Sequence, residues 1–223
     1  MPKIGREIKR LQAAGYPVKN VLDIIQNDEN LDTIVYTSPE FQPCADTFPA
    51  AHYAFVGPSI RPAEMRMEKS AQPLVYISLG TVVNDQLAFY QQCVAALADG
   101  PCRVILSIGE QVKPAALGTL PGNVEVHAHV DQIAVLQIAD VFLTHCGMNS
   151  ASEALYFGVP LVMFPQTPEQ GGVCTRVLEL GAGVKLDKPE AASIRKAAEI
   201  SEGFRRCAGA KGAAEKILSV ISK

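Results

Sequence analysis

The sequence contains no tryptophan, no C-x-x-C pair and no apolar run near the roughly eighteen residues that a membrane-spanning helix needs. We therefore expect no membrane span. The six cysteines are scattered, and the opening Met-Pro-Lys-Ile-Gly-Arg-Glu lacks the apolar segment of a secretion signal. These features predict reduced thiols in a cytoplasmic protein and argue against a disulfide framework or a zinc site.

Basic clusters are also missing. The chain has 20 Lys and Arg against 23 Asp and Glu, a formal net charge of -3, and its basic residues form no run. This balance creates no field that would attract nucleic acid or an anionic membrane. Residues 114–175 include neither Lys nor Arg. An anion bound by this stretch must therefore be held by backbone N–H groups, hydroxyls, a helix end and His145.

Several metal-binding and nucleotide-binding motifs are absent as well. The chain has no Asp-x-Asp pair and no other clustered carboxylates that would chelate Mg²⁺. It has neither the G-x-x-x-x-G-K-[ST] loop of P-loop enzymes nor a G-x-G-x-x-G fingerprint. A P-loop nucleotide site and a dinucleotide-binding site are therefore not predicted. We expect no metal and no cofactor.

The chain does have enough apolar sequence to build a core. Its 223 residues are 48% apolar and 19% charged, with 17 Gly and 15 Pro. This composition excludes a disordered chain, a collagen-like repeat and a disulfide-stapled miniprotein. One large domain or two small ones are expected from the length.

From residue 74 onward, short apolar segments alternate with amphipathic ones. Strands that are apolar throughout are buried on both faces, and helices between them form crossovers. The predicted fold class is therefore α/β, a Rossmann-like parallel sheet with helices on both faces. Strands are predicted at 74–79, 103–108, 124–127, 140–144 and 161–164, and helices at 85–98, 132–138, 149–157, 169–180 and 190–222.

The first sixty residues are organised differently. Their apolar pattern predicts two helices and two strands, at 4–13, 18–26, 33–37 and 52–56. Two strands alone cannot bury themselves, so residues 1–60 are interpreted as the tail of an otherwise missing amino-terminal domain. A charged stretch then makes residues 61–73 a linker, and residues 74–223 form the main domain.

The turn after the predicted strand 140–144 carries the candidate chemistry. It reads His145-Cys-Gly-Met-Asn-Ser-Ala-Ser-Glu153, in which Gly147 allows a tight turn and a helix begins at Asn149 or Ser150. Ligands of parallel sheets bind at the carboxyl ends of strands, and a helix amino end attracts anions. A purely structural interpretation is also open, because Ser150 and Glu153 have the spacing of a capping box.

This turn resembles the donor-binding signature HCGxNSxxE of the UDP-dependent glycosyltransferases. Residues 130–132 and 135–136 are similar to the start of that signature, WxPQxxVL. His129 stands where the family usually has a Trp that stacks on uracil. An imidazole is a smaller platform than an indole, and it weakens the preference for uridine.

Other segments extend the resemblance along the chain. Residues 158–160 (GVP) and 165–170 resemble the end of the signature, and residues 76–81 (YISLGT) resemble the loop that approaches the diphosphate. Residues 176–183 are also similar to the family. The ordered motifs are most similar to bacterial macrolide-type glycosyltransferases.

The resemblance implies a nucleotide-sugar site without a metal. Glu153 would bind the ribose hydroxyls, and Glu169 and Gln170 would bind the hydroxyls of the sugar. The residues implied around the diphosphate are Gly80, Thr81, His145, Gly147, Asn149 and Ser150, and those implied around the uridine are His129, Val130 and Gln132.

Each implied role has a structural alternative. His145 is alternatively a hydrogen-bonded core histidine, and His129 an exposed loop residue. Thr81 is alternatively the N-cap of the next helix. Glu169 and Gln170 alternatively only open a helix, since acidic residues favour its first turn.

The resemblance also shows what the chain lacks. Family members have two Rossmann-like halves, the GT-B architecture, with the active site in the cleft between them. This chain resembles the last two strands of the first half plus the second half, and it is shorter than the family between residues 186 and 191. None of its four histidines (His52, His127, His129 and His145) matches the family's catalytic base, so we expect no catalytic residue in this chain.

The implied function is a glycosyltransferase that moves a hexose from a UDP-sugar to a hydroxyl of a small lipophilic acceptor, with inversion. The base would lie on the amino-terminal half, in the same chain or in a second subunit. Two alternatives stay open: a non-catalytic nucleotide-sugar-binding subunit or inactive fragment, and a nucleotide-sugar epimerase of the same fold. The unpaired strand edges at 33–37 and 52–56 also predict self-association of the isolated chain.

Overall fold

The computed structural model describes residues 2–20, 23, 32–188, 190–191 and 193–194. The chain divides into two units, Met1–Gly57 and Pro58–Lys223, and each is described by itself. The interpretation of the first unit as the tail of another domain stays a prediction. The predicted helices 18–26 and 190–222 lie largely outside the described residues.

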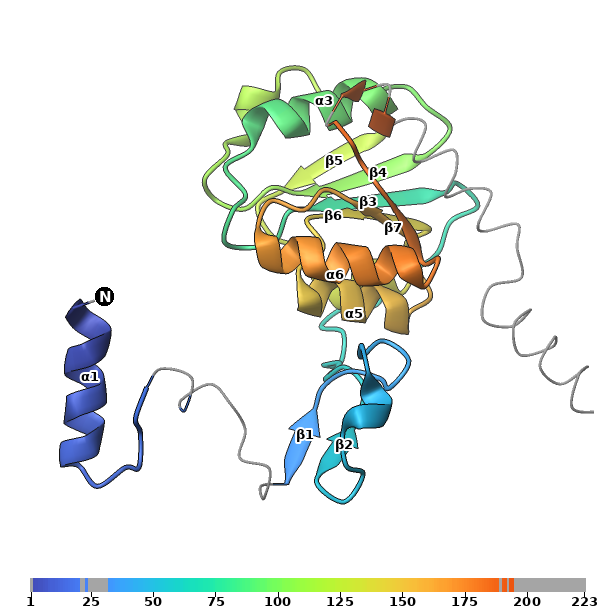
Figure 1. The fold of residues 1–223 in the computed structure, drawn as a ribbon. Coiled ribbons are helices and arrows are strands. Elements are labelled where there is room, and N and C mark those ends of the chain that lie inside the picture. The colour runs from blue at the N-terminus through green and yellow to red at the C-terminus, as the bar shows by residue number, and fades with distance from the viewer. Residues whose placement is uncertain (1, 21–22, 24–31, 189, 192, 195–223) are drawn as a thin grey trace, which may run out of the picture. The chain divides into compact units, whose positions relative to one another are not determined.

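The first unit contains the predicted first helix and both predicted strands (Figure 1). The two strands are shorter than predicted and pair in parallel. The ring of Phe48 packs edge-on against Tyr53 and Phe55, which anchors the second strand. The elements are α1 (Pro2–Ala13), β1 (Thr33–Val35), the 3-10 helix η1 (Ala45–Thr47) and β2 (Tyr53–Phe55).

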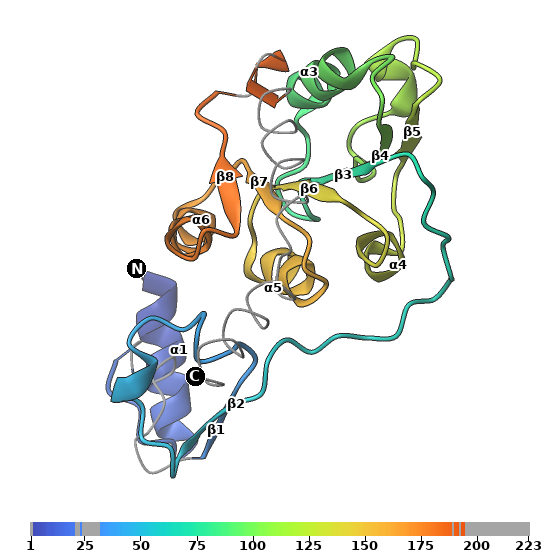
Figure 2. The same ribbon diagram turned by 90° about the vertical axis from the view of Figure 1, so that its right-hand side faces the viewer.

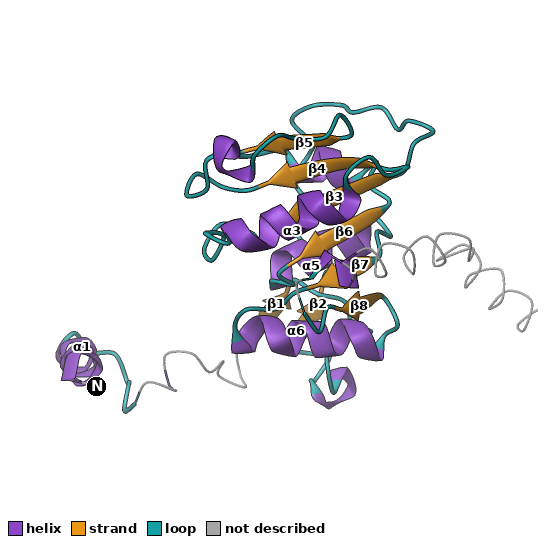
Figure 3. Cartoon of the chain, turned by 90° about the horizontal axis from the view of Figure 1, so that it is seen from above, coloured by secondary structure: helices purple, strands orange, loops and turns teal. Residues whose placement is uncertain are grey.

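The second unit is built on a six-stranded sheet in the order β5-β4-β3-β6-β7-β8, with all neighbours parallel (Figure 3). This confirms the predicted fold class. The last strand was not predicted, because its three residues begin with Gly, end with an exposed Lys and are never fully buried. The strands are β3 (Leu74–Ser78), β4 (Arg103–Ser107), β5 (Val124–His127), β6 (Val141–Thr144), β7 (Leu161–Met163) and β8 (Gly183–Lys185).

Helices cover both faces of this sheet (Figure 2). From β3 the chain steps to β4 and β5, and from β6 it steps the other way to β7 and β8; right-handed crossovers therefore put the helices of the two halves on opposite faces. No described helix is long and apolar enough to cross a bilayer. One face carries α3 (Leu87–Leu97) and the 3-10 helix η2 (Pro114–Leu117), and the other carries α4 (Gln132–Leu136), α5 (Met148–Tyr156) and α6 (Pro168–Glu179).

The core follows from the alternation of side chains along the central strands. Val75 and Ile77 of β3 belong to the cluster that also contains Phe89 of α3. Tyr76, between them, points to the other face and stacks on Phe142 of β6 with 4.6 Å between ring centroids. Burial on both faces fixes the strands firmly, and the loops at their carboxyl ends are held in place by this frame.

Candidate functional site

A cavity of about 600 Å³ opens at the carboxyl ends of the strands in the second unit. It lies where the sheet changes direction between β3 and β6, the switch point at which parallel α/β folds bind ligands. All twelve residues that the sequence assigns to the site line this cavity. The loops after β3, β5 and β6 and the helices α4, α5 and α6 supply them, so segments up to ninety positions apart in the chain are brought together.

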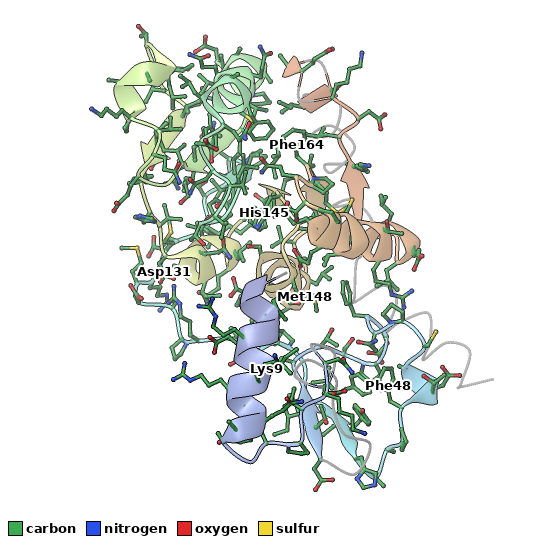
Figure 4. The ribbon with its side chains drawn as sticks, turned by 60° about the vertical axis from the view of Figure 1, so that its left-hand side comes forward. Lys9, Phe48, Asp131, His145, Met148 and Phe164 are labelled. Carbon is green, nitrogen blue, oxygen red and sulfur yellow. The ribbon has the colours of Figure 1, made fainter. Side chains whose placement is uncertain are left out.

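The turn between β6 and α5 forms one wall of the cavity, and Figure 4 labels His145 and Met148 at its two ends. The prediction that Gly147 makes the tight turn was wrong. Cys146 has the left-handed φ of 65°, whereas Gly147 has a φ of -66° and is the N-cap of α5. Cys146 is held by its buried side chain and by its N–H, which donates to Thr144 Oγ1 at 3.2 Å. Burial raises the pKa of its thiol to about 12, so this cysteine is not a nucleophile at neutral pH.

His145 lies between two glycines. A Cβ atom on Gly80 would be 2.6 Å from the His145 ring, and one on Gly147 would be 2.5 Å from its Nε2. Glycine is therefore needed on both sides to let the backbone approach the imidazole. Burial lowers the pKa of His145, and the backbone carbonyl of Ser78 and the charge of Glu169 only partly oppose this effect. The side chain is therefore neutral at pH 7. It lines the cavity and also lies 3.4 Å from Thr144 Oγ1 through its Nδ1, so its role in binding stays a prediction.

α5 begins at Met148, before either predicted start, and this changes the meaning of its polar residues. Gly147 supplies no capping side chain, and Ser150 already lies in the first turn. The capping-box alternative for Ser150 and Glu153 was therefore wrong. The first N–H groups of α5 have no side-chain cap, and Asn149 and Ser150 line the cavity beside them. A helix end of this kind attracts anionic ligands.

A chain of hydrogen bonds joins four cavity residues at the side of α4. Gln132 Nε2 donates to Glu153 Oε2 at 2.6 Å and lies 3.4 Å from Ser150 Oγ. Tyr76 donates its hydroxyl to Gln132 Oε1 at 3.2 Å. Glu153 is thus held by an amide rather than by a cation, and one of its oxygens stays available to a ligand hydroxyl. Burial raises the pKa of Tyr76, so its hydroxyl remains a donor.

The loop after β3 carries Gly80 and Thr81. The N–H of Gly80 donates to Ser78 Oγ at 3.2 Å, and Gly80 adopts a left-handed φ of 77°. The alternative that Thr81 caps the next helix was wrong, because α3 begins at Leu87 with Gln86 as its N-cap. Thr81 is instead exposed at the cavity wall.

Glu169 and Gln170 do open α6, as the structural alternative states, and they also line the cavity. Thr167 is the N-cap, and its Oγ1 accepts from the Gln170 N–H at 3.3 Å. Gln170 Oε1 accepts from the Gln166 N–H at 2.8 Å. The side-chain carbonyl oxygen of Gln170 is therefore used within the protein, while its Nε2 has no hydrogen-bond partner among the described residues. Glu169 is exposed, and its carboxylate is open to a ligand.

The loop between β5 and α4 supplies His129 and Val130. His129 is exposed, as the alternative states, and its Nε2 lies 3.6 Å from Glu110 Oε1. Both residues nevertheless line the cavity. Asp131, next in the chain and labelled in Figure 4, accepts from Arg61 Nη2 at 2.7 Å and from the Glu64 N–H at 2.5 Å. It fixes the linker against this loop.

The sequence missed several lining residues. Arg61 is the one Lys or Arg among the described residues that line the cavity, and it comes from the linker, where no local motif marks it. Its guanidinium is paired with Asp131 and lies 3.5 Å from Glu64 Oε1. Ser107 ends β4 and Gly109 follows it, and their position at the carboxyl end of a buried strand could have identified them. No group of three His, Cys, Asp or Glu side chains gathers as a metal site in the described part of the chain.

Comparison with known proteins identifies the family to which this chain belongs. Residues 91–219, more than half of the chain, match the family model described as erythromycin biosynthesis protein CIII-like, C-terminal domain. An uncharacterized UDP-glucosyltransferase of Bacillus subtilis (strain 168), YojK, is 35% identical over 92% of this chain and 56% of its own length. The oleandomycin glycosyltransferase of Streptomyces antibioticus is 38% identical over 71% of this chain and 38% of its own length.

Solved structures agree with this relationship. The calicheamicin glycosyltransferase has a TM-score of 0.73 and 34% identity, covering 98% of this chain and 59% of its own. The kitacinnamycin glycosyltransferase has a TM-score of 0.76 and 33% identity, covering 96% of this chain and 60% of its own. The chain thus spans little more than half the length of these relatives. It belongs to the macrolide-type UDP-glycosyltransferase family of GT-B fold and corresponds to the carboxyl-terminal, donor-binding half.

Proposed function

We propose that this chain binds a UDP-sugar as the donor half of a glycosyltransferase. The complete enzyme transfers a hexose to a hydroxyl of a small lipophilic acceptor, with inversion and without a metal. The observation that carries the proposal is the gathering of all twelve assigned residues around one cavity of about 600 Å³. That volume lies in the usual range for small-molecule and cofactor sites.

The assigned roles follow the chemistry of each wall. The open amino end of α5, with Asn149, Ser150 and neutral His145, donates hydrogen bonds to the diphosphate. Glu153 accepts from the ribose hydroxyls, because among the described residues its carboxylate is hydrogen-bonded by the Gln132 amide alone. Gly80 and Thr81, in the loop after β3, approach the diphosphate beside His145.

The remaining assigned residues bind the two ends of the donor. Glu169 and the Nε2 donor of Gln170 bind sugar hydroxyls at the start of α6. Gln132, His129 and Val130 lie on the side proposed for the uridine. His129 offers a smaller stacking surface than an indole, so the proposal commits more firmly to the diphosphate than to the base.

Metal independence is part of the proposal. The described cavity residues offer the carboxylates Glu153 and Glu169, which come from different helices and belong to no group of three potential ligands. Uncharged donors can hold the diphosphate, because a helix amino end and oriented N–H groups stabilise negative charge without a cation. Arg61 adds little net charge, since Asp131 already pairs with it.

The chain alone is proposed to bind donor and transfer no sugar. His52 contacts Asp32 at 3.2 Å, but both belong to the first unit and have exposed side chains. His127 lies beside Glu125 and does not line the cavity. The base is therefore assigned to the amino-terminal half that the relatives contain, in one chain or as a second subunit. A non-catalytic donor-holding subunit is the second candidate, favoured because none of the four histidines, all of them in the described part of the chain, is assigned as the base.

Calorimetric titration with UDP in buffer containing EDTA tests the proposal. We expect binding without divalent metal, and we expect His145→Ala and Ser150→Ala each to weaken it by about 1.5–3 kcal/mol, the usual loss for a hydrogen bond to a charged group. His127→Ala is the matched control, because this exposed histidine lies outside the cavity. An absolute requirement for Mg²⁺, or unchanged affinity in both site variants, contradicts the assignment.

A further inference from the structure

Two amide side chains, Asn84 and Gln166, stand behind the cavity wall without lining it. Asn84 is only 4% exposed, although it follows the exposed residues Thr81 and Val82 of the same loop. Gln166 is half-buried and precedes the N-cap of α6. Neither residue was singled out by the sequence, and neither has a place in the proposed contacts with the donor.

Asn84 fixes the loop that carries Gly80. Its Nδ2 donates to the Gly80 carbonyl oxygen at 2.9 Å, closing the loop on itself. The amide also fills the space above Gly109, where a methyl group would overlap it. Asn84 Oδ1 is buried without a hydrogen-bond partner among the described residues. Burying an unpaired acceptor is unfavourable, so this amide is retained at a cost in stability.

Gln166 connects the same loop to α6. Its Nε2 donates to the Val83 carbonyl oxygen at 3.2 Å, and its backbone N–H donates to Gln170 Oε1 at 2.8 Å. A continuous path of hydrogen bonds and short backbone steps thus runs from Gly80 through Asn84 and Gln166 to Gln170. One end of this path lies at the proposed diphosphate wall and the other at the proposed sugar wall.

We propose that Asn84 and Gln166 are positioning residues that hold the diphosphate and sugar walls in one fixed relation. Asn84 sets the backbone of Gly80 and Thr81, and Gln166 ties that loop to the Gln170 side chain. The inference rests on the proposed function, since it takes the cavity as a nucleotide-sugar site. A donor bridges both walls, so an unlinked loop and helix must be ordered anew each time it binds.

The experiment compares UDP and UDP-glucose binding by calorimetry for the full chain and three variants. Asn84→Ala is expected to weaken both ligands about tenfold, and Gln166→Ala to weaken UDP-glucose more than UDP, because Gln170 faces the sugar. Asn123→Ala is the matched control. Its Nδ2 likewise donates to backbone carbonyls, of Leu97 at 2.9 Å and Cys102 at 2.8 Å, but at the amino ends of the strands, away from the cavity. It should lower the melting temperature and leave both affinities within about twofold.

Hydrogen exchange of the free chain separates the two proposals. Asn84→Ala and Gln166→Ala should speed exchange in residues 79–87 and 165–171, while Asn123→Ala should not. Wild-type chain that fails to bind UDP, with faster exchange in these variants, overturns the proposed function and leaves the linkage standing. Wild-type chain that binds UDP, with both variants binding as tightly as wild type, overturns the positioning role. Unchanged exchange in both variants overturns the linkage itself.

Discussion

His145, with a neutral imidazole, is the central residue of the proposed site. It is packed between Gly80 and Gly147, and its burial keeps it uncharged at pH 7. A neutral ring can donate to a phosphate oxygen and does not need an acidic partner to balance it. Glu153 shows the complementary arrangement, since a carboxylate held by one amide keeps an oxygen for the ligand.

Glu153→Gln separates a ligand role from a structural one. A Gln carbonyl can still accept from Gln132 Nε2, so we expect little change in melting temperature. UDP affinity should fall about fivefold, because a neutral oxygen is a weaker acceptor for ribose hydroxyls than a carboxylate, by ~1 kcal/mol. Glu179→Gln, on the outer side of α6, is the control. Unchanged affinity together with a lower melting temperature would make Glu153 structural.

The lowered pKa of His145 predicts a dependence of stability on pH. In the unfolded chain the histidine takes up a proton near its ordinary pKa of about 6.5, whereas the folded chain resists protonation until lower pH. His145 therefore costs no stability above that pH and destabilises the fold as the pH falls below it. Urea unfolding at pH 8 and pH 5.5 should show a larger loss for wild type than for His145→Asn, which cannot titrate. Equal losses in the two proteins would contradict the neutral assignment.

At the scale of elements, the turn between β6 and α5 combines strain with close approach. Cys146 takes the left-handed conformation, and its buried thiol lies 3.3 Å from Met163 Sδ of β7. Local sequence favours Gly147 for such a turn, because glycine adopts positive φ most easily. Tertiary packing instead places the buried cysteine there and uses the glycine to admit the imidazole.

Gly147→Ala tests whether the glycine is needed to make room for the His145 ring. Its φ suits alanine, so the backbone tolerates the change, but the new methyl group must displace the His145 ring. We expect UDP affinity to fall at least tenfold, with a loss of stability of about 1–3 kcal/mol from overpacking. Gly171→Ala in α6 is the control, because a Cβ there meets nothing within 4 Å. If both variants bind UDP like wild type, the close contact between Gly147 and His145 has no role in binding.

The sequence predicts elements well where one rule decides them. The central residues of β3, β4 and β6 are apolar and buried because both faces of the sheet are covered, and the positions of these strands were confirmed to within a residue or two. The start of α5 was placed too late, because Asn149 and Ser150 are good N-caps locally while the packing of Gly147 selects an earlier start. β8 was missed because a short half-buried strand has no such pattern.

At the scale of the whole molecule, the contacts of the linker could not be predicted from local sequence patterns. Arg61 lies seventy positions before Asp131, yet their ion pair brings the linker to the edge of the cavity. Lys69 pairs similarly with Asp140 at 2.6 Å, near the start of β6. Motif spacing could single out twelve residues that line the cavity, because each lies in a short signature, whereas their roles in binding stay predictions. It could not predict contacts between a charged linker and an aspartate that only the folded chain brings together.

The chain also spans only part of its relatives' length, and we propose that sugar transfer requires the remaining part of that length. Mass spectrometry of products formed from UDP-glucose and a flavonoid or macrolide acceptor tests this claim most directly. The purified 223-residue chain is expected to bind the donor and form no glycoside. A fusion that places the amino-terminal half of the Bacillus subtilis relative ahead of it should restore transfer. Robust glycoside formation by the 223-residue chain alone would contradict the account and place the acceptor base among its own residues.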